Sequence, residues 1–379
     1  MALGLYLHIP FCPQKCHYCD FVSYPMAEAE LVEIFLQALA REMELYSRSG
    51  RLHEKKLASL YFGGGTPTCL TAGQLVWLLE NCRHFLPWSD EIEVTVEANP
   101  GTLNREKLQA LRENGVNRLS LGAQSFDAML LEAMGRKHRP EDIREAVSLA
   151  REAGFDNLSL DLIYGLPGQT LDQWEETLCQ AVSLQPEHLS VYGLILEPNT
   201  LWGQLVEEGK LLPADDELAL TMYNFARVYL HRAGYEHYEI SNFARPGFHS
   251  KHNCRYWLNQ DYLGLGPAAS SWCGGKRWTN FAGLAEYISR LQRNLRPVAE
   301  ETELDLQEEM VETVLLGLRL LRGIDLQAFC QRFGMELFAV FPEAVRRFTD
   351  LGLLEEDGGY LRLTAKGLPL ANFVWQEFV

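Results

Sequence analysis

Three cysteines lie within eight positions near the start of the chain, in the stretch "HIPFCPQKCHYCDF". Their spacing, C-x3-C-x2-C, gathers Cys12, Cys16 and Cys19 in one segment directly after an apolar run, and two prolines prevent a helix there. The chain has nine cysteines, an odd number with irregular spacing, which fits a reducing compartment better than a disulfide framework. We therefore expect the three clustered thiols to bind metal.

Two kinds of metal centre are compatible with this spacing. A structural zinc site takes four ligands, usually from two separated pairs. Here the position two past the last cysteine is Phe21, and only His17, inside the same loop, offers a fourth ligand. Three thiolates fit better with an iron–sulfur cubane in which one iron stays open to a substrate or cofactor.

A glycine-rich stretch, "YFGGGTPT" (61–68), follows the second apolar run. Three consecutive glycines let the backbone approach a ligand closely, where a side chain would block it. The stretch is not a P-loop, because no Lys-Ser/Thr pair follows. A tight turn between a strand and a helix explains the glycines equally well.

Polar residues stand at the ends of three further apolar runs: Glu97 in "VEANP", Gln124 in "LGAQSF" and Asp161 in "LDLIYGLP". A carboxylate or amide in such a place is costly unless it is paired or bound to a ligand. Because the three positions are equivalent on successive strands, they indicate one shared pocket.

The elements that must position these residues alternate between short β-rich runs and amphipathic helical patterns. We expect strands at 3–9, 57–63, 92–98, 117–123, 157–163 and 189–195. Helical patterns lie at 28–48, 71–85, 104–114, 140–153, 171–184 and 215–233. Strands connected through helices form a mainly parallel sheet, here an incomplete (βα)6 barrel of the α/β class. In such a barrel the chemistry lies at the carboxyl ends of the strands.

The character of the chain changes after residue 241, so we expect three regions. The barrel occupies 1–241, an aromatic and glycine-rich connecting segment without a clear period follows at 242–300, and a mainly helical domain fills 301–379. The last region has helices followed by a short hairpin, which is typical of a winged-helix-like domain.

Composition limits the possible partners. A net charge of −17 argues against nucleic acid, whose phosphates attract clustered Lys and Arg. No stretch reaches the roughly 18 apolar residues of a membrane span, and the N-terminus has no basic leader. We expect a cytoplasmic protein with at most peripheral membrane contact.

Taken together, the cysteine spacing, G-G-G-T-P, V-E-A-N-P, A-Q-S-F and D-L-I-Y-G-L-P resemble the radical S-adenosylmethionine (SAM) superfamily. The chain is most similar to the branch that contains oxygen-independent coproporphyrinogen III oxidases and HemW-type haem chaperones. The resemblance implies that Cys12, Cys16 and Cys19 hold a 4Fe-4S cluster, whose open iron is chelated by SAM. Such a cluster can cleave SAM to methionine and a 5′-deoxyadenosyl radical.

The same resemblance implies a set of SAM contacts. Tyr18 matches an aromatic residue near the adenine, Glu97 a ribose ligand, and Arg136 a partner of the SAM carboxylate. The remaining matches are Tyr6, Gly64, Gly65, Thr66, Gln124 and Asp161.

Within the branch, the resemblance favours the haem chaperones. The oxidases carry a further cysteine where this chain has Phe21, and "HNCRYW" matches the H-N-x-x-Y-W signature of the chaperones. His252 would then be a haem ligand, with His249 and Cys254 as alternatives, unless it is simply hydrogen-bonded. Ser270 replaces a histidine found in many relatives.

Two functions follow from the resemblance. The first is a chaperone that binds haem and passes it to an acceptor such as a respiratory enzyme, with no coproporphyrinogen oxidase activity. The alternative is a coproporphyrinogen III oxidase, which the complete SAM pocket favours.

Overall fold

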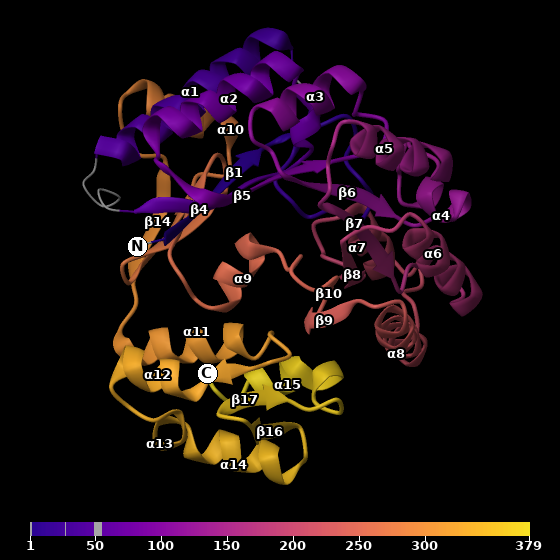
Figure 1. Cartoon of the computed structure of the whole chain (residues 1–379), viewed down its shortest axis with the longest axis vertical. Coiled ribbons are helices and arrows are strands. Elements are labelled where there is room, and N and C mark those ends of the chain that lie inside the picture. Colours follow the sequence, from indigo (N-terminus) through magenta and orange to yellow (C-terminus); the bar gives the residue numbers. More distant parts are fainter. Residues whose placement is uncertain (1, 27, 49–54) are drawn as a thin grey trace.

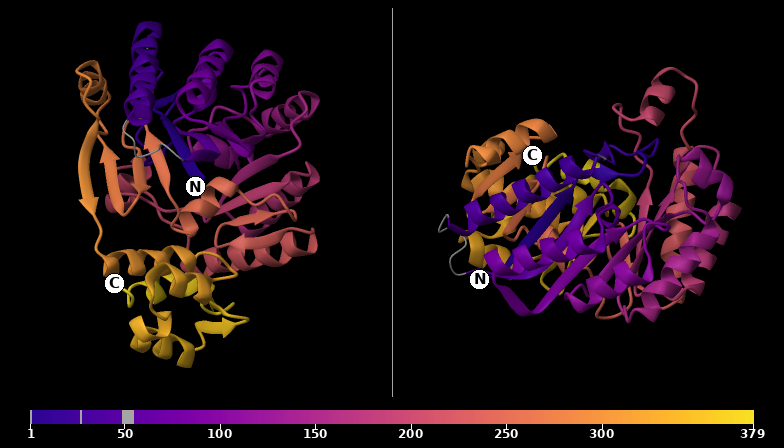
Figure 2. Two further views of the ribbon diagram at one scale, coloured as in Figure 1. Left: turned by 60° about the vertical axis from the view of Figure 1, so that its left-hand side comes forward. Right: turned by 90° about the horizontal axis from the view of Figure 1, so that it is seen from above.

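The computed structural model describes residues 2–26, 28–48 and 55–379, so residues 1, 27 and 49–54 of the predicted first region lie outside it. Six parallel strands follow one another in the sheet, as predicted, and they curve with helices on their outer side (Figures 1 and 2). The strands are β1 (Ala2–Ile9), β4 (Lys56–Gly64), β5 (Trp88–Ala98), β6 (Arg118–Gln124), β7 (Leu158–Tyr164) and β8 (His188–Gly193). The outer helices are α1 (Ala29–Arg48), α2 (Ala72–Phe85), α3 (Arg105–Glu113), α5 (Pro140–Glu152), α6 (Leu171–Ser183) and α8 (Asp216–Arg232).

Local sequence accounts for most of these boundaries. Thr71 and Thr170 begin α2 and α6 with reciprocal capping boxes, which satisfy backbone N–H groups that the first helical turn leaves free. Gly115 and Gly154 follow α3 and α5 with φ of 93° and 83°, a conformation that favours glycine. The predicted elements are therefore confirmed to within a few residues.

Each barrel strand has one face that packs in the apolar core and one face that points into the lumen of the barrel. Every residue of β6 is buried, yet Leu119 and Leu121 belong to the apolar core, whereas Arg118 and Ser120 line a cavity. This alternation follows from the two-residue period of a strand. Polar side chains at alternate positions therefore face inward, toward the lumen.

The segment at 242–300, whose sequence shows no clear period, contains several strands that extend the sheet on both sides. On one side, β8 pairs with β10 (Asn242–Ala244), which pairs with β9 (Glu236–Glu239). On the other, β1 pairs in parallel with β11 (Tyr262–Leu265), which continues through antiparallel β12 (Ser270–Cys273), β13 (Lys276–Asn280) and β14 (Val298–Glu303). These pairings extend the parallel core to a sheet of 12 strands.

Helix α9 (Lys251–Trp257) is made of the H-N-x-x-Y-W segment itself and lies between the sheet and the C-terminal region (Figure 1). Ser250 begins it, because its side chain accepts a hydrogen bond from the Asn253 backbone. The carboxylate of Glu93, on β5, accepts from the backbone N–H groups of Lys251 and His252 at 3.0 Å each. Neither contact produces a helical repeat of apolar residues in the sequence, so the sequence pattern did not predict this helix.

A buried carboxylate ties α1 to the extended side of the sheet. Glu42 accepts hydrogen bonds from the Gly266 backbone at 2.9 Å, the Tyr287 hydroxyl at 2.6 Å and the Asn280 amide at 2.7 Å. Tyr287 lies on α10 (Leu284–Gln292), which packs on α1. Burial raises the pKa of Glu42 to about 7.

The C-terminal region has an apolar core of its own and the predicted order of helices followed by a hairpin. Its helices are α11 (Leu306–Gly317), α12 (Leu326–Phe333), α13 (Leu337–Val340), α14 (Pro342–Asp350) and α15 (Ala371–Trp375). Its sheet consists of β15 (Ile324–Asp325), β16 (Leu354–Asp357) and β17 (Tyr360–Leu363). The arrangement agrees with the expected winged-helix-like domain.

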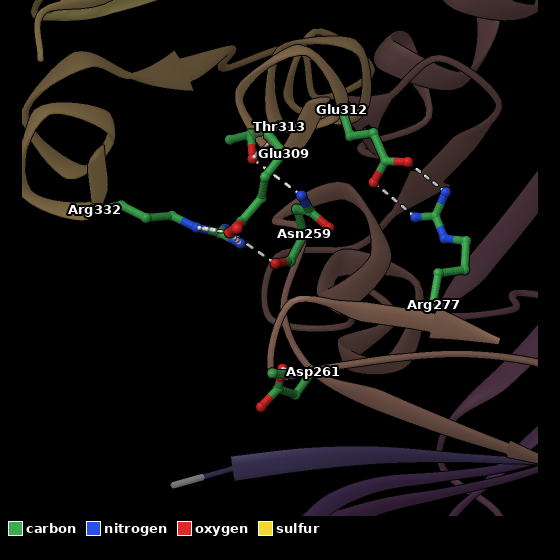
Figure 3. A network of polar contacts seen from close by, with 8 residues as sticks. Asn259, Asp261, Arg277, Glu309, Glu312, Thr313 and Arg332 are labelled. Atoms are coloured by element: carbon green, nitrogen blue, oxygen red, sulfur yellow. Dashed lines mark hydrogen bonds and ion pairs between the residues drawn. The ribbon is translucent and has the colours of Figure 1, made fainter. Parts of the chain in front are cut away.

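Polar contacts join this domain to the segment after α9 (Figure 3). Asn259 donates from its side chain to Thr313 and accepts at its backbone carbonyl from Arg332, both at 3.0 Å. On β13, Arg277 forms a two-pronged ion pair with Glu312 of α11. The end of α9 is thereby fixed to the C-terminal domain.

Candidate functional site

The cysteine segment is held by the backbone on both sides. Cys12 ends the short strand β2 (Phe11–Cys12), which pairs with β3 (Tyr24–Pro25). The backbone of His17 accepts from Trp202, on α7 (Leu201–Glu207), at 2.9 Å and donates to Met134, just after α4 (Ala128–Ala133), at 3.0 Å. The loop is therefore positioned by the β2–β3 pair and by two short helices that the sequence did not reveal.

The three thiols line one cavity of about 510 Å³ at the carboxyl ends of the strands. Burial raises the pKa of both Cys16 and Cys19, so these thiols must lose protons when metal binds. No three His, Cys, Asp or Glu side chains among residues 2–26, 28–48 and 55–379 converge on a point where they could hold a metal ion.

These observations test the two metal centres. The Nδ1 atom of His17 lies 2.8 Å from the backbone carbonyl of Ala133, and His17 is not among the residues that line the cavity in the described structure. A zinc ion would need four ligands around one centre. A 4Fe-4S cluster instead lets each of three thiolates bind a different iron and leaves the fourth iron open, which fits three thiols that line one cavity.

The glycine turn lies against the cysteine segment. The backbone N–H groups of Gly65 and Thr66 donate to the carbonyls of Ile9 and Phe11, at 2.8 and 2.7 Å. A Cβ on Gly65 would lie 2.5 Å from the Phe11 carbonyl oxygen, so this glycine is required by the turn itself. Gly64, Gly65 and Thr66 also line the cavity, and the Thr66 hydroxyl lies 3.0 Å from the sulfur of Cys12.

The polar residues at the strand ends line the same cavity, which places Glu97, Gln124 and Asp161 together. Burial raises the pKa of Glu97 to about 7 and also raises the pKa of Asp161. Gln124 has a φ of 64°, which is strained for a residue other than glycine. Such strain is a feature of ligand-binding positions.

Arg136 lies beside the cysteines. Its guanidinium donates to the side-chain oxygen of Asn99 at 2.6 Å and to the Tyr18 hydroxyl at 2.9 Å. Although burial opposes its charge, the nearby Tyr18 and Cys16 raise the pKa of Arg136. Burial also raises the pKa of Tyr18 to about 12, so the phenol stays protonated. Both side chains line the cavity.

Two residues implied by the resemblance, Tyr6 and His252, lie one layer deeper. Both rings stack on Tyr61, which itself lines the cavity, with centroids 6.2 and 5.1 Å away. The Nδ1 atom of His252 lies 2.9 Å from the Ser59 hydroxyl, and its Nε2 atom lies 2.7 Å from the Tyr256 hydroxyl. His252 is only 1% exposed, and burial lowers its pKa to about 3. Both nitrogens are therefore occupied in this conformation.

The two alternative haem ligands are also engaged or shielded. His249 stacks on Tyr238 and pairs through Nε2 with Glu236 at 2.9 Å. Burial raises the pKa of the Cys254 thiol to about 12, which keeps it protonated.

The sequence analysis did not predict several residues that line the cavity, among them Tyr61, Asn99, Arg118 and Tyr192. Arg118 could have been found, because a charged residue stands inside the apolar run "NRLSLGA". Asn99 lies two positions after Glu97 and was passed over in favour of the carboxylate.

Comparisons with known proteins agree with this geometry. Residues 6–180 match the radical SAM superfamily, and residues 304–370 match the HemN C-terminal domain. The chain is 40% identical to a Bacillus subtilis protein named Heme chaperone HemW, over 99% of this chain and 98% of that relative. A protein of the same name from Lactococcus lactis is 36% identical, with 99% and 96% covered.

A solved structure also matches over nearly the whole chain. Coproporphyrinogen III oxidase (HemN) from Escherichia coli, described as a radical SAM enzyme, superposes with a TM-score of 0.86 at 26% identity. The match covers 99% of this chain and 89% of that one.

Proposed function

Because this chain belongs to the HemW family of the radical SAM superfamily, we propose that it is a haem chaperone with a SAM-ligated 4Fe-4S cluster. The observation that carries the proposal is its full-length similarity to proteins that bear the chaperone name, together with one cavity whose described lining includes three thiols and no fourth. The protein would bind haem and pass it to an acceptor protein.

We assign the cluster to Cys12, Cys16 and Cys19. When bound, a cluster with one open iron supplies a site for SAM and an electron to cleave it. The protein's own contribution is placement, since the β2–β3 pair and the backbone contacts of His17 fix the loop at the mouth of the barrel. Arg136, beside the thiols, stabilises their negative charge once they lose their protons.

We assign the SAM pocket to the wall of the same cavity that the cysteines line. Glu97 would accept hydrogen bonds from ribose hydroxyls, Arg136 would pair with the SAM carboxylate, and Tyr18 would lie against the adenine. Gly64, Gly65, Thr66, Gln124 and Asp161 complete that wall, with Tyr6 packed behind it through Tyr61.

His252 is our candidate for the haem ligand. Its Nε2 atom is held by Tyr256, so ligation would replace that hydrogen bond. Helix α9, which carries both residues, also contributes Asn253 to the cavity. A haem bound at this end of the cavity would therefore lie within reach of the helix that bears the ligand.

Delivery of haem requires contact with an acceptor, for which a respiratory enzyme is our candidate. Within the described part of the chain, no helix is long and apolar enough to cross a membrane. We propose a cytoplasmic protein that meets a membrane-bound acceptor at most peripherally, with no role for nucleic acid.

Coproporphyrinogen III oxidation is the second candidate, because the HemN structure superposes over nearly the whole chain. Phe21 opposes it: this residue stands where the oxidases carry a further cysteine, and it lies 67% exposed at the cavity. An apolar residue there cannot supply a thiol.

Anaerobic titration of haem into the cluster-loaded protein, followed by absorbance, tests the proposal, with coproporphyrinogen and SAM assayed on the same sample. A saturable Soret shift without decarboxylation supports the chaperone. Porphyrin turnover without haem binding would reject it in favour of the oxidase.

A further inference from the structure

Arg118 is a buried cation whose side chain forms no hydrogen bond or ion pair with the residues that the structure describes. It lies at the start of β6, is 2% exposed, and lines the cavity at its inner end, away from the cysteine loop. Its Nε atom is buried with no hydrogen bond, and no hydrogen bond or ion pair joins its side chain to any other residue that the structure describes. A buried guanidinium with five unused donors is unfavourable unless a ligand or solvent satisfies it.

The nearest acidic groups are already engaged elsewhere. Glu93 accepts from the first N–H groups of α9, and Glu97 accepts from the Tyr61 hydroxyl at 2.7 Å. Asp161 accepts from the Ser120 hydroxyl at 3.1 Å. The carboxylates of Glu93, Glu97 and Asp161 act on Arg118 through space, but in the described structure none of them forms an ion pair with it. The guanidinium therefore remains available to a group that enters the cavity.

A second donor lies at the same cavity. Asn253 of α9 lines it, and within the described residues the Asn253 side chain makes no hydrogen bond. A planar guanidinium and an amide both donate hydrogen bonds, so together they favour a ligand that has two acceptor oxygens on one atom. A carboxylate is such a ligand, and it forms a bidentate pair with a guanidinium.

We propose that the inner end of the cavity is a carboxylate subsite, with Arg118 as its anchor and Asn253 as a second donor. The ligand carboxylate that we assign to it is a propionate of haem, an assignment that rests on the proposed function. The carboxylate of SAM is the other source with the same chemistry, and binding measurements separate the two.

The test uses the full chain with its cluster, and three ligands: haem, haem dimethyl ester and SAM. Affinities are measured anaerobically for the wild type, Arg118→Gln and Arg118→Lys. Arg105→Gln is the matched control, because Arg105 is 76% exposed on α3 and its loss removes a charge away from the cavity. We expect Arg118→Gln to weaken haem binding about tenfold or more and to leave the ester nearly unchanged, since esterification removes the charged partner.

Each outcome decides between the sources. If Arg118→Gln weakens only SAM binding, the carboxylate subsite exists but binds the carboxylate of SAM and not a propionate of haem. Equal losses for haem and its ester, or no loss for any of the three ligands, would overturn the subsite. If the wild type binds neither haem nor its ester, the proposed function fails, and the SAM affinities alone decide on Arg118.

Denaturant unfolding of the ligand-free variants tests whether Arg118 has a purely structural role. Because the guanidinium forms no hydrogen bond or ion pair with the described residues, and the carboxylates reach it only through space, Arg118→Gln should unfold at about the wild-type denaturant concentration. A marked loss of stability in Arg118→Gln that Arg118→Lys restores, with all affinities unchanged, would show an internal counter-ion and overturn the proposal.

Discussion

The hydroxyl of Tyr61 donates a 2.7 Å hydrogen bond to the carboxylate of Glu97. The same tyrosine ring stacks on His252, so one side chain on β4 contacts both the proposed SAM pocket and the proposed haem ligand. Any change in the position of Tyr61 therefore affects both sites.

Replacing Tyr61 with Phe should shift the pH dependence of SAM binding. Burial raises the pKa of Glu97 to about 7, although the hydrogen bond from Tyr61 partly lowers it. Without this hydrogen bond the pKa rises further, so the ionised carboxylate that accepts from ribose forms only at higher pH. We expect SAM affinity to fall about threefold to tenfold near neutral pH and to recover as the pH increases. Equilibrium binding across pH 6 to 9 would show this, and Tyr192→Phe, in the same cavity, should keep the wild-type profile.

Replacing Cys16 or Cys19 with Ala should remove the cluster. Each thiolate would hold one iron, so two remaining ligands leave the cluster weakly bound. We expect iron and sulfide content and the brown absorbance to fall strongly after anaerobic reconstitution. Cys69→Ala is a control, because Cys69 lies on the short 3-10 helix Pro67–Cys69 directly after the glycine turn and has no assigned metal role. Equal iron loss in Cys69→Ala would mean that the ligand set is misassigned.

Tyr256→Phe should strengthen haem ligation by His252. The Tyr256 hydroxyl occupies Nε2 in the structure, and its removal frees that nitrogen without removing the aromatic ring. We expect tighter haem binding in Tyr256→Phe and a loss of the nitrogen-ligated spectrum in His252→Ala. Absorbance and electron paramagnetic resonance of the haem complex distinguish these cases. A spectrum that disappears in His249→Ala but survives in His252→Ala would move the ligand to His249.

Stability should fall as the pH rises through the titration of Glu42. Its pKa is about 7 in the folded protein and near 4.5 when exposed, so the folded state binds an extra proton between these values. The native state is therefore favoured below about pH 4.5 and loses about 3 kcal/mol as the pH rises to 7, at 1.36 kcal/mol per pKa unit.

Urea unfolding of the wild type and Glu42→Gln from pH 5 to 8 measures this contribution. The amide is neutral and similar in shape, so the variant should show a shallower decline with pH. Glu97 and Asp161, whose pKa values burial also raises, add to the decline in both proteins and leave a residual slope. Parallel slopes in the two proteins would show that Glu42 does not carry the effect.

The barrel could be predicted from the sequence because its signals are local. Thr71, Thr170, Gly115 and Gly154 mark helix ends within a few residues of the patterns they bound. The shared pocket of Glu97, Gln124 and Asp161 could be predicted from their equivalent places on successive strands, because the carboxyl ends of such strands lie at the same end of a barrel.

Helix α9 could not be predicted in the same way. Its start depends on Glu93, which lies 158 residues away in sequence from Lys251, and seven residues are too few to show a helical period. The contact of Ser59 with His252 could not be predicted either, because Ser59 lies on β4, 193 positions away in the sequence.

Helix α9 also sets an order of events. Asn253 of this helix lines the same cavity as the three cysteines, and the carboxylate of Glu93 caps the start of the helix. If haem lies against α9 and SAM lies over it beside the cysteines, haem must bind first and can leave only after SAM has gone.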